Sequence, residues 1–317
     1  MKEEKKVFYS SLISLVLPIA VQNLMTALVS ASDALMLGFL DQSSLSAVSL
    51  ATQVQFVLNL FLAALTIGAT ILAAQYWGKG DTKAVEKVLG IVLKLSAAVG
   101  FVFFLAAAVC PGVLMHIFTG EAELVDKGIV YLRTVSLSYL FTSVSQIYLC
   151  IMKNTGRTLK STVYGSTSVV LNIVLNAVLI FGLLGLPKME IAGAALATVL
   201  ARGVELFLVL LENARTDTVK IRWEYLRQGD EVLKKDFYHY TAPVMANELV
   251  WGCGFTMFSV IMGHLGSDAV AANSLANIVK NIIACICLGI GSGSGILVGN
   301  ELGRGALQRA RDYGSRL

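Results

Sequence analysis

Six charged side chains lie more than four residues from either end of the long apolar segments of this sequence. They are Asp33, Lys94, Arg202, Glu205, Glu248 and Lys280. A charge inside a bilayer is costly, so such residues usually face a water-filled cavity or a partner of opposite charge. No basic residue shares the expected depth of Asp33. This carboxyl group is therefore a candidate functional residue.

Three uncharged polar residues share that depth. With the rise of an α-helix, Asp33 lies about 8 Å and Asn176 about 9 Å below the outer ends of their segments. Thr198 lies about 10 Å into its segment, and Asn172 is one turn deeper than Asn176. The sequence therefore predicts that one carboxylate and three hydrogen-bonding side chains form a single polar site.

Other polar residues recur at helical spacing, and each set shares one face of a helix. The sets are Gln22 and Thr26 with Asp33, Ser168 with Asn172 and Asn176, and Gln55, Asn59, Thr66 and Thr70. Such stripes either line a wet cavity or make hydrogen bonds between helices. Both interpretations remain open, and we include Gln22, Thr26, Gln55, Asn59 and Arg202 as candidate cavity-lining residues.

Glu248 and Lys280 lie on consecutive apolar segments, deep enough for neighbouring antiparallel helices to bring them together. Their role is either a structural ion pair or ion coupling in the second half of the chain. Arg202 and Glu205 are three residues apart and can form an ion pair on one helix.

These residues must be positioned by membrane-spanning helices. The 317 residues are 56% hydrophobic and only 15% charged, which excludes a disordered chain, a disulfide-rich secreted domain and an ordinary cytosolic enzyme. Eight apolar stretches are long enough to cross a bilayer. They cover residues 10–38, 45–76, 89–111, 129–152, 161–184, 191–212, 237–263 and 269–299. The predicted fold is all-α and polytopic, and we find no nucleotide-binding, nucleophile or metal-ligand motif that would indicate an enzyme, a cofactor or a bound metal.

Basic residues indicate the orientation. Nineteen of the 25 lysines and arginines fall in the N-terminus, the even-numbered loops and the C-terminal tail. The positive-inside rule then places both ends in the cytoplasm of, we expect, a bacterial inner membrane. The formal charge of +4 gives no reason to expect nucleic acid, and we expect a monomer.

The chain repeats itself with an offset of 225 residues. Pro18 then aligns with Pro243, and 13 identities fall between positions 18 and 80. The offset contains six crossings, so the two copies share one orientation. We divide the chain into a six-helix lobe (1–213), a cytoplasmic linker (214–236) carrying a short amphipathic helix, and two helices of a second lobe (237–317). A complete repeat would need four more helices, which predicts a twelve-helix protein. The alternative is a native eight-helix protein.

Several segments resemble the MATE (multidrug and toxic compound extrusion) family. They are LP at 17–18, DALMLG at 33–38, AAQYWGKGD at 73–81, YLR at 131–133, LNI at 171–173, FG at 181–182, Pro187 and GAALAT at 193–198. Four positions depart from the family pattern. Asn176 is neutral where some relatives have an acid, Glu190 replaces a usual glycine, and Arg157 replaces a usual acid. Trp251 stands where other members have an acid, eight residues after the proline, and Glu248 lies one turn earlier.

The resemblance implies two six-helix lobes and an antiporter that exports amphipathic or cationic drug-like molecules in exchange for Na⁺ or H⁺. It implies that Asp33 couples the cation, with Asn172, Asn176 and Thr198 beside it, and Pro18 offers a hinge in the first helix. Glu248 and Lys280 are candidates for a second site. The rival hypotheses are a flippase for lipid-linked precursors and a membrane fragment that does not transport.

Overall fold

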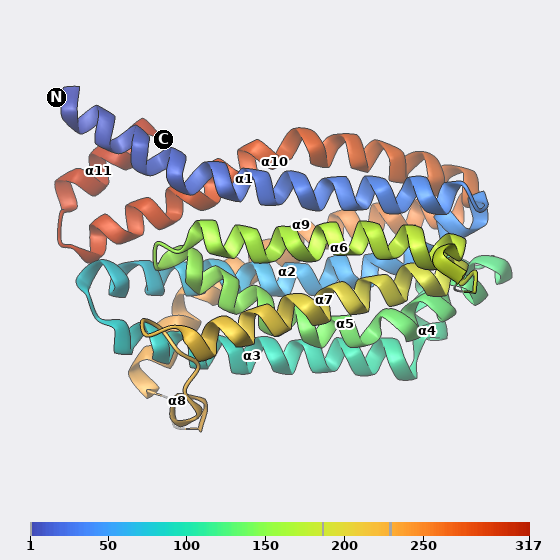
Figure 1. The fold of residues 1–317 in the computed structure, drawn as a ribbon, viewed down its shortest axis with the longest axis horizontal. Helices are drawn as coiled ribbons and strands as arrows, with labels where there is room; N and C mark the ends of the chain where they lie inside the picture. Colours follow the sequence, from blue (N-terminus) through green and yellow to red (C-terminus); the bar gives the residue numbers. More distant parts are fainter. Residues whose placement is uncertain (1, 186, 228–229) are drawn as a thin grey trace.

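The computed structural model describes residues 2–185, 187–227 and 230–317, and the regular elements in these ranges are all helical. Figure 1 shows the long helices lying side by side in one elongated bundle. The elements are α1 (Lys2–Gly38), α2 (Gln42–Lys79), α3 (Thr82–Val109), α4 (Pro111–Phe118), α5 (Ala122–Asn154), α6 (Thr158–Phe181), the 3₁₀ turn η1 (Leu183–Gly185), α7 (Glu190–Arg215), α8 (Trp223–Arg227), α9 (Glu231–His264), α10 (Ser267–Gly303) and α11 (Leu307–Arg316).

Eight of these helices are long and apolar enough to cross a membrane, and they confirm the eight predicted spans. Several begin earlier than the apolar pattern indicates, because polar side chains cap them. Asp81 accepts a hydrogen bond from the Ala84 amide, so α3 starts before the expected residue 89. Asp230 does the same at the start of α9, which extends that helix into the predicted linker. Such caps satisfy amide groups that have no partner in the first turn.

One helix begins with a strained residue. Glu190, the first residue of α7, has φ +49°. This left-handed conformation brings the Cβ of an L-residue close to its carbonyl oxygen and favours glycine. The strain occurs at the position where the family resemblance leads us to expect glycine.

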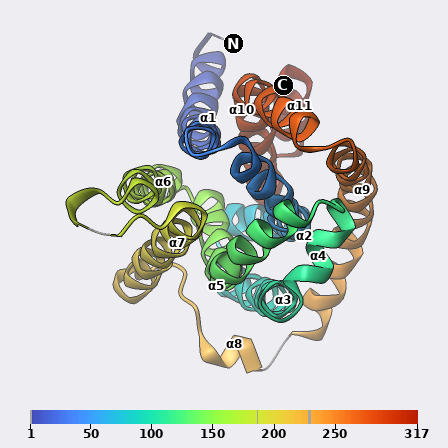
Figure 2. The same cartoon turned by 90° about the vertical axis from the view of Figure 1, so that its right-hand side faces the viewer.

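The first six spans pack around α5. Helix α5 contacts α2, α3 and α7, while α6 packs between α7 and α1. Figure 2 shows α6 and α7 on one side of the bundle and α9 and α10 on the other. The interior is apolar around the large buried side chains Tyr139, Leu132 and Leu58. Polar residues that the bundle also buries therefore need partners inside it.

The contacts between the two halves follow the sequence repeat. Ser274 donates a hydrogen bond to Ser49, 225 residues away, at 2.5 Å. A Cβ on Gly78 would meet the backbone of Asn300, and a Cβ on Gly303 would meet the backbone of Gln75, the repeat equivalent of Asn300. Helix α1 packs against α10 just as α9 packs against α2. Repeat-equivalent residues of α2 and α10 therefore make the same contacts in both directions, as expected for two helices related by a twofold axis.

Pro18 lies within the continuous helix α1. The α1 residues on either side of it, Val16 and Ala20, are those that a Cβ on Gly293 or Gly289 of α10 would strike. These glycines therefore allow close packing of α1 against α10. The contact is tight next to the predicted hinge, and bending at Pro18 stays a prediction.

The connection between the halves crosses one end of α3. It contains α8, the predicted short helix, whose Trp223 side chain is 79% exposed. Glu86 of α3 accepts hydrogen bonds from the Lys220 amide at 3.0 Å and from Arg222 Nε at 2.6 Å. Figure 2 shows α8 beneath α3. These hydrogen bonds to Glu86 therefore hold the connection against α3 of the first six spans.

Candidate functional site

Three helices bring the four predicted site residues together in one chain of hydrogen bonds. Asn176 of α6 donates from Nδ2 to the Asp33 carboxylate of α1. The same Nδ2 donates to Asn172 Oδ1 at 3.2 Å, and Asn172 Nδ2 donates to Thr198 Oγ1 of α7 at 3.3 Å. The sequence prediction that these residues form one polar site is therefore correct in its geometry.

This cluster carries oxygen atoms that can take a ligand. Asn176 is fully buried, and its Oδ1 has no partner among the described residues. Asp33 is only partly buried, so a ligand can approach its carboxylate from outside the hydrogen-bonded cluster. Carboxylate, amide and hydroxyl oxygens are the donors that hard cations prefer. The arrangement can therefore hold either a proton on Asp33 or a small cation among these oxygens.

Sequence reasoning missed one neighbour of the site. Tyr131 of α5 is buried, and its phenol lies close enough to Asp33 to interact with the charge of that carboxylate. Tyr131 contributes a fourth helix to the surroundings of Asp33. The only signal in the sequence was the place of Tyr131 in the segment 131–133, which does not indicate where its side chain points.

Gln22 and Thr26 lie near the cluster on α1 but make no bond to it. Gln22 is buried against Gly165 of α6. Thr26 donates to the backbone oxygen of Gln22 at 3.0 Å. The stripe on α1 is thus divided between packing against α6 and the Asp33 site.

The polar stripe on α2 also divides. Thr70 accepts a hydrogen bond from Asn154 of α5 at 3.1 Å, so the lower part of the stripe joins helices. Gln55 is half-buried and Asn59 is exposed, and neither makes a side-chain hydrogen bond with another described residue. Of the two alternatives, helix–helix bonding holds at Thr70, and a cavity-lining role remains for Gln55 and Asn59.

The expected ion pair between Glu248 and Lys280 does not form. No carboxylate of the described residues lies within 4 Å of Lys280, and its ammonium group lies 4.7 Å from the ring centre of Phe255 instead. The reason is helix packing: α9 packs mainly on α2, while α10 packs on α1 and α2, so α9 and α10 touch only sparingly. The sequence predicted the depth of Glu248 and Lys280 in the membrane, but not which helices pack against α9 and α10.

Arg202 and Glu205 form the predicted ion pair. Arg202 Nη1 lies 2.8 Å from Glu205 Oε2, and Ser145 of α5 donates to the other carboxylate oxygen at 2.6 Å. The Glu205 side chain is fully buried. Both carboxylate oxygens are engaged, which gives this pair a structural role and neutralises the Arg202 charge.

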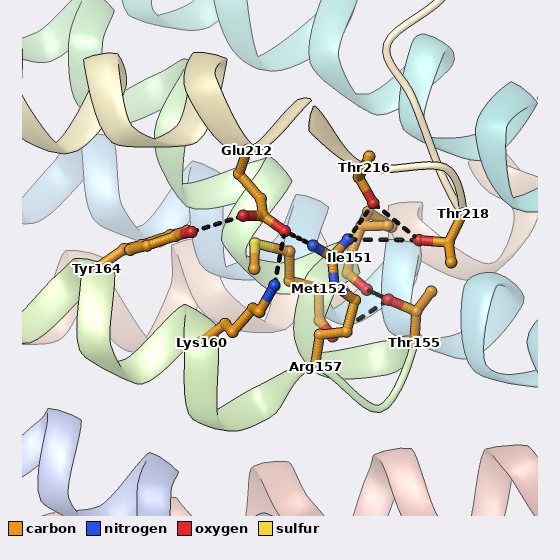
Figure 3. A network of polar contacts seen from close by, with 9 residues as sticks. All are labelled: Ile151, Met152, Thr155, Arg157, Lys160, Tyr164, Glu212, Thr216 and Thr218. Atoms are coloured by element: carbon orange, nitrogen blue, oxygen red, sulfur yellow. Dashed lines mark hydrogen bonds and ion pairs between the residues drawn. The ribbon is translucent and has the colours of Figure 1, made fainter. Parts of the chain in front are cut away.

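A second polar network, absent from the sequence prediction, joins α5, α6 and α7 at one end of the bundle. Figure 3 shows Glu212 of α7 at its centre, facing Arg157, Lys160 and Tyr164. The Tyr164 hydroxyl donates to Glu212 at 2.6 Å, and Lys160 Nζ lies 3.4 Å away. Arg157 pairs with the same carboxylate and also donates to Thr216 at 2.8 Å.

One ion pair fixes the start of α9 to α3. Lys87 Nζ lies 3.0 Å from Asp230, the residue that caps α9. The hydrogen bond from Lys87, together with the backbone amide of Leu233, holds the pKa of Asp230 below its ordinary value. The ionised form of Asp230 therefore joins the two halves of the chain.

The comparisons with known proteins agree on one family. The family model MatE matches residues 18–178 and 243–317. The chain is 28% identical over 312 residues to the "Probable multidrug resistance protein NorM" of Thermotoga maritima, covering 96% of this chain and 65% of the relative. It is 25% identical over 309 residues to the "Multidrug resistance protein PmpM" of Pseudomonas aeruginosa, covering 95% and 63%.

Solved structures share the fold. The "MATE multidrug transporter DinF-BH", solved in complex with a small molecule, matches with a TM-score of 0.87 and 22% identity, covering 96% of this chain and 68% of that one. An outward-facing "multidrug resistance MATE family transporter of the MOP superfamily" matches with a TM-score of 0.83 and 20% identity, covering 96% and 67%. The chain spans just under two thirds of the length of the curated relatives given above.

Proposed function

The chain belongs to the MatE family. We propose that it functions in a secondary active exporter of amphipathic or cationic small molecules. Na⁺ or H⁺ drives this export by entering through a site at Asp33. The transported cation is a substrate of this exchange and not a resident cofactor. Relatives named as multidrug resistance proteins support the proposal. We further propose that the protein is a monomer in a bacterial inner membrane, with its N-terminus in the cytoplasm.

One observation carries the proposal: the bonded chain from Asp33 through Asn176 and Asn172 to Thr198. It links a half-buried carboxylate on α1 to a buried amide oxygen without a partner among the described residues. The oxygen belongs to the same amide group that donates to Asp33, so it lies beside the carboxylate. A cation bound at Asp33 would use it.

Exchange follows from competition for Asp33. A proton or Na⁺ on the carboxylate weakens the hydrogen bond from Asn176, because that bond is strongest to the ionised group. The same event removes the negative charge that would attract a cationic substrate. Occupancy by the coupling cation therefore favours release of the substrate, and its departure restores the binding charge.

The test is efflux of a cationic rhodamine ester dye from membrane vesicles, with an imposed Na⁺ or proton gradient. Asp33→Asn should abolish the response to the gradient at equal expression. Asp217→Asn makes the same chemical change at a carboxylate that is 98% exposed, and should leave efflux unchanged. Gradient-driven efflux retained in Asp33→Asn would refute the role of Asp33.

A wild-type chain that moves no dye under either gradient would refute the proposed function itself. The flippase hypothesis would then have to be tested with lipid-linked substrates. It is not favoured by the charges, because the central Arg202 is already neutralised by Glu205.

A further inference from the structure

The start of α9 carries two adjacent lysines that no carboxylate of the described residues neutralises. Lys234 and Lys235 lie in the first two turns of the helix, and both side chains are exposed. The ion pair beside them joins Lys87 to Asp230, the residue that caps α9, and reaches neither lysine. Two neighbouring positive charges repel each other, so an anion placed between them would be stabilised.

A surface cavity of about 510 Å³ lies over these two lysines. The residues that line it are Glu231, Val232, Lys234, Lys235 and Tyr238. The ammonium groups and the phenol hydroxyl can all donate hydrogen bonds to a phosphate. Val232 is exposed and adds an apolar surface beside them. Two ammonium groups face one carboxylate in this lining, so positive charge is in excess.

The cavity lies at the level expected for lipid headgroups. The apolar span of α9 begins at residue 237, and the two lysines precede it by about 3–5 Å along the helix. The polar layer of a bilayer extends about 5–8 Å beyond the hydrocarbon on each side. Tyr238 and Tyr240, both exposed, lie at the edge of the span, where aromatic residues are enriched in membrane proteins.

Helix α8 marks the same level on the neighbouring surface. The Tyr225 backbone of α8 lies against Gly90 of α3, where an added Cβ would come within 3.0 Å of the Tyr225 oxygen. Gly90 is at the edge of the apolar span predicted at 89–111, and Trp223 of α8 is largely exposed. Figure 1 shows α8 at the end of the bundle where the N-terminus lies. Both α8 and the start of α9 therefore lie at one membrane surface.

The repeat indicates which side of α9 faces outward. With the offset of 225 residues, Lys234 corresponds to Tyr9 of α1, and Leu233 corresponds to Phe8. Phe8 and Leu233 are both buried, so the two helices turn the same side inward. Tyr9 is exposed although α1 packs within a unit of six spans. The position of Lys234 is therefore an outward one in both copies, and only the second copy has a lysine there.

We propose that this cavity at the start of α9 binds an anionic phospholipid of the surrounding leaflet. The lipid phosphate lies between Lys234 and Lys235 and accepts a hydrogen bond from Tyr238, and the acyl chains lie along the apolar span. Positive side chains near a membrane surface attract anionic lipid by about fivefold each. The site requires only that the chain spans a bilayer, so it is independent of the proposed export function.

The test measures lipid preference at the cavity with a single fluorophore. Val232→Trp, combined with Trp77→Phe, Trp223→Phe and Trp251→Phe, places one tryptophan in the cavity lining. The full 317-residue chain is reconstituted in nanodiscs at physiological salt. Phosphatidylglycerol or phosphatidylcholine with brominated acyl chains, which quench tryptophan on contact, is then titrated against the other lipid without bromine.

The chain with both lysines should bind phosphatidylglycerol in preference to phosphatidylcholine. Lys234→Gln together with Lys235→Gln should lower this relative affinity about thirtyfold, or about fivefold for each charge. Lys234→Arg with Lys235→Arg keeps the charges and should retain the preference. Glu231→Gln removes the carboxylate that opposes the lipid phosphate, and should raise the relative affinity.

The matched control is Lys79→Gln together with Arg311→Gln. These residues of α2 and α11 are exposed and lie outside the cavity lining. Salt screens charges that lie more than about 8 Å apart at the surface, so this pair of changes should alter the preference less than about twofold. Equal losses in the two double variants would show a response to the charge of the whole surface and would overturn the site.

Two other results would overturn the proposal. The first is equal quenching by the two brominated lipids in the chain that keeps both lysines. The second is relief of the phosphatidylglycerol quenching by millimolar inorganic phosphate, which would show that the cavity takes free phosphate instead of a lipid. We expect no such relief, because the acyl chains hold the lipid phosphate at the membrane surface.

Discussion

Neutralising Glu212 should destabilise the six-helix unit more than any single change to an exposed carboxylate. The Glu212 side chain is only 8% exposed, and it accepts from Tyr164 and pairs with Arg157 and Lys160. Removing one partner of a buried ion pair costs about 3–5 kcal/mol. Arg157 keeps its bond to Thr216, and Lys160 is well exposed. We therefore expect Glu212→Gln to cost about 2–3 kcal/mol, at or just below the lower end of that range.

The assay is thermal unfolding of the detergent-solubilised chain, followed by loss of the monodisperse peak in size-exclusion chromatography. The expected loss corresponds to a fall in Tm of about 3–5 °C for a chain of this size. Tyr164→Phe removes a single hydrogen bond to the same carboxylate and should cost about 1.5 kcal/mol. The double variant should lose less than the sum, because both changes act on one network.

Glu123→Gln is the matched control. Glu123 pairs with Lys127 one turn away on α5 at 2.9 Å, but its side chain is 65% exposed. Water and salt screen such a surface pair, so its loss should leave the Tm almost unchanged. Equal losses of stability in Glu212→Gln and Glu123→Gln would refute the claim that burial makes the Glu212 network important.

Two further predictions concern single residues. Glu190→Gly should stabilise the chain by about 0.5–1 kcal/mol in the same thermal assay, because it relieves the left-handed strain; Glu190→Ala keeps the Cβ and should give no such gain, and equal gains would contradict the reasoning. Lys87 lowers the pKa of Asp230 in the folded chain. The Lys87–Asp230 pair therefore stabilises the fold at any pH above the ordinary aspartate pKa. This stabilisation is lost as the pH falls through the lowered pKa that Asp230 has in the folded chain. Measured Tm between about pH 2 and 5 should therefore fall less steeply in Lys87→Gln than in wild type, and parallel curves would refute the link.

The eight spans and the Asp33 site were predictable because their signals are local. Long apolar runs define the spans, and helix rise alone places Asp33, Asn176 and Thr198 at one depth. The Arg202–Glu205 pair is likewise set by a spacing of three residues on one helix. Each of these predictions needed only the period of a helix and the thickness of a bilayer.

Of the two alternatives for Glu248 and Lys280, the structural ion pair was wrong because depth does not specify which helices are neighbours. Consecutive spans α9 and α10 pack on α2 and α1 rather than closely on each other. The repeat contains this information in principle, since α1 and α2 of the first copy are also only weakly packed together. The contacts of α9 and α10 can be inferred from those of α1 and α2 only when the structure of one repeat copy is known.

The Glu212 network could not be predicted for a different reason. Its members come from the turn before α6, from α6 itself and from the end of α7. In the sequence, Arg157 stands out only as a basic loop residue that departs from the family pattern, and nothing singles out Glu212. Their partnership depends on the angle at which α6 lies along α7, which no spacing within either helix determines.

Helix α1 is the element through which occupancy at Asp33 can reach the second half of the chain. On one face, Asp33 is bonded to Asn176 of α6. On another face, Val16 and Ala20 press against glycines of α10, with Pro18 between them. If a cation releases the bond to α6, α1 keeps its tight contact with α10 while losing an attachment to the first six-helix unit. Under the proposed function, a change of charge at one carboxylate therefore alters how firmly the two halves are joined, without any direct contact between Asp33 and α10.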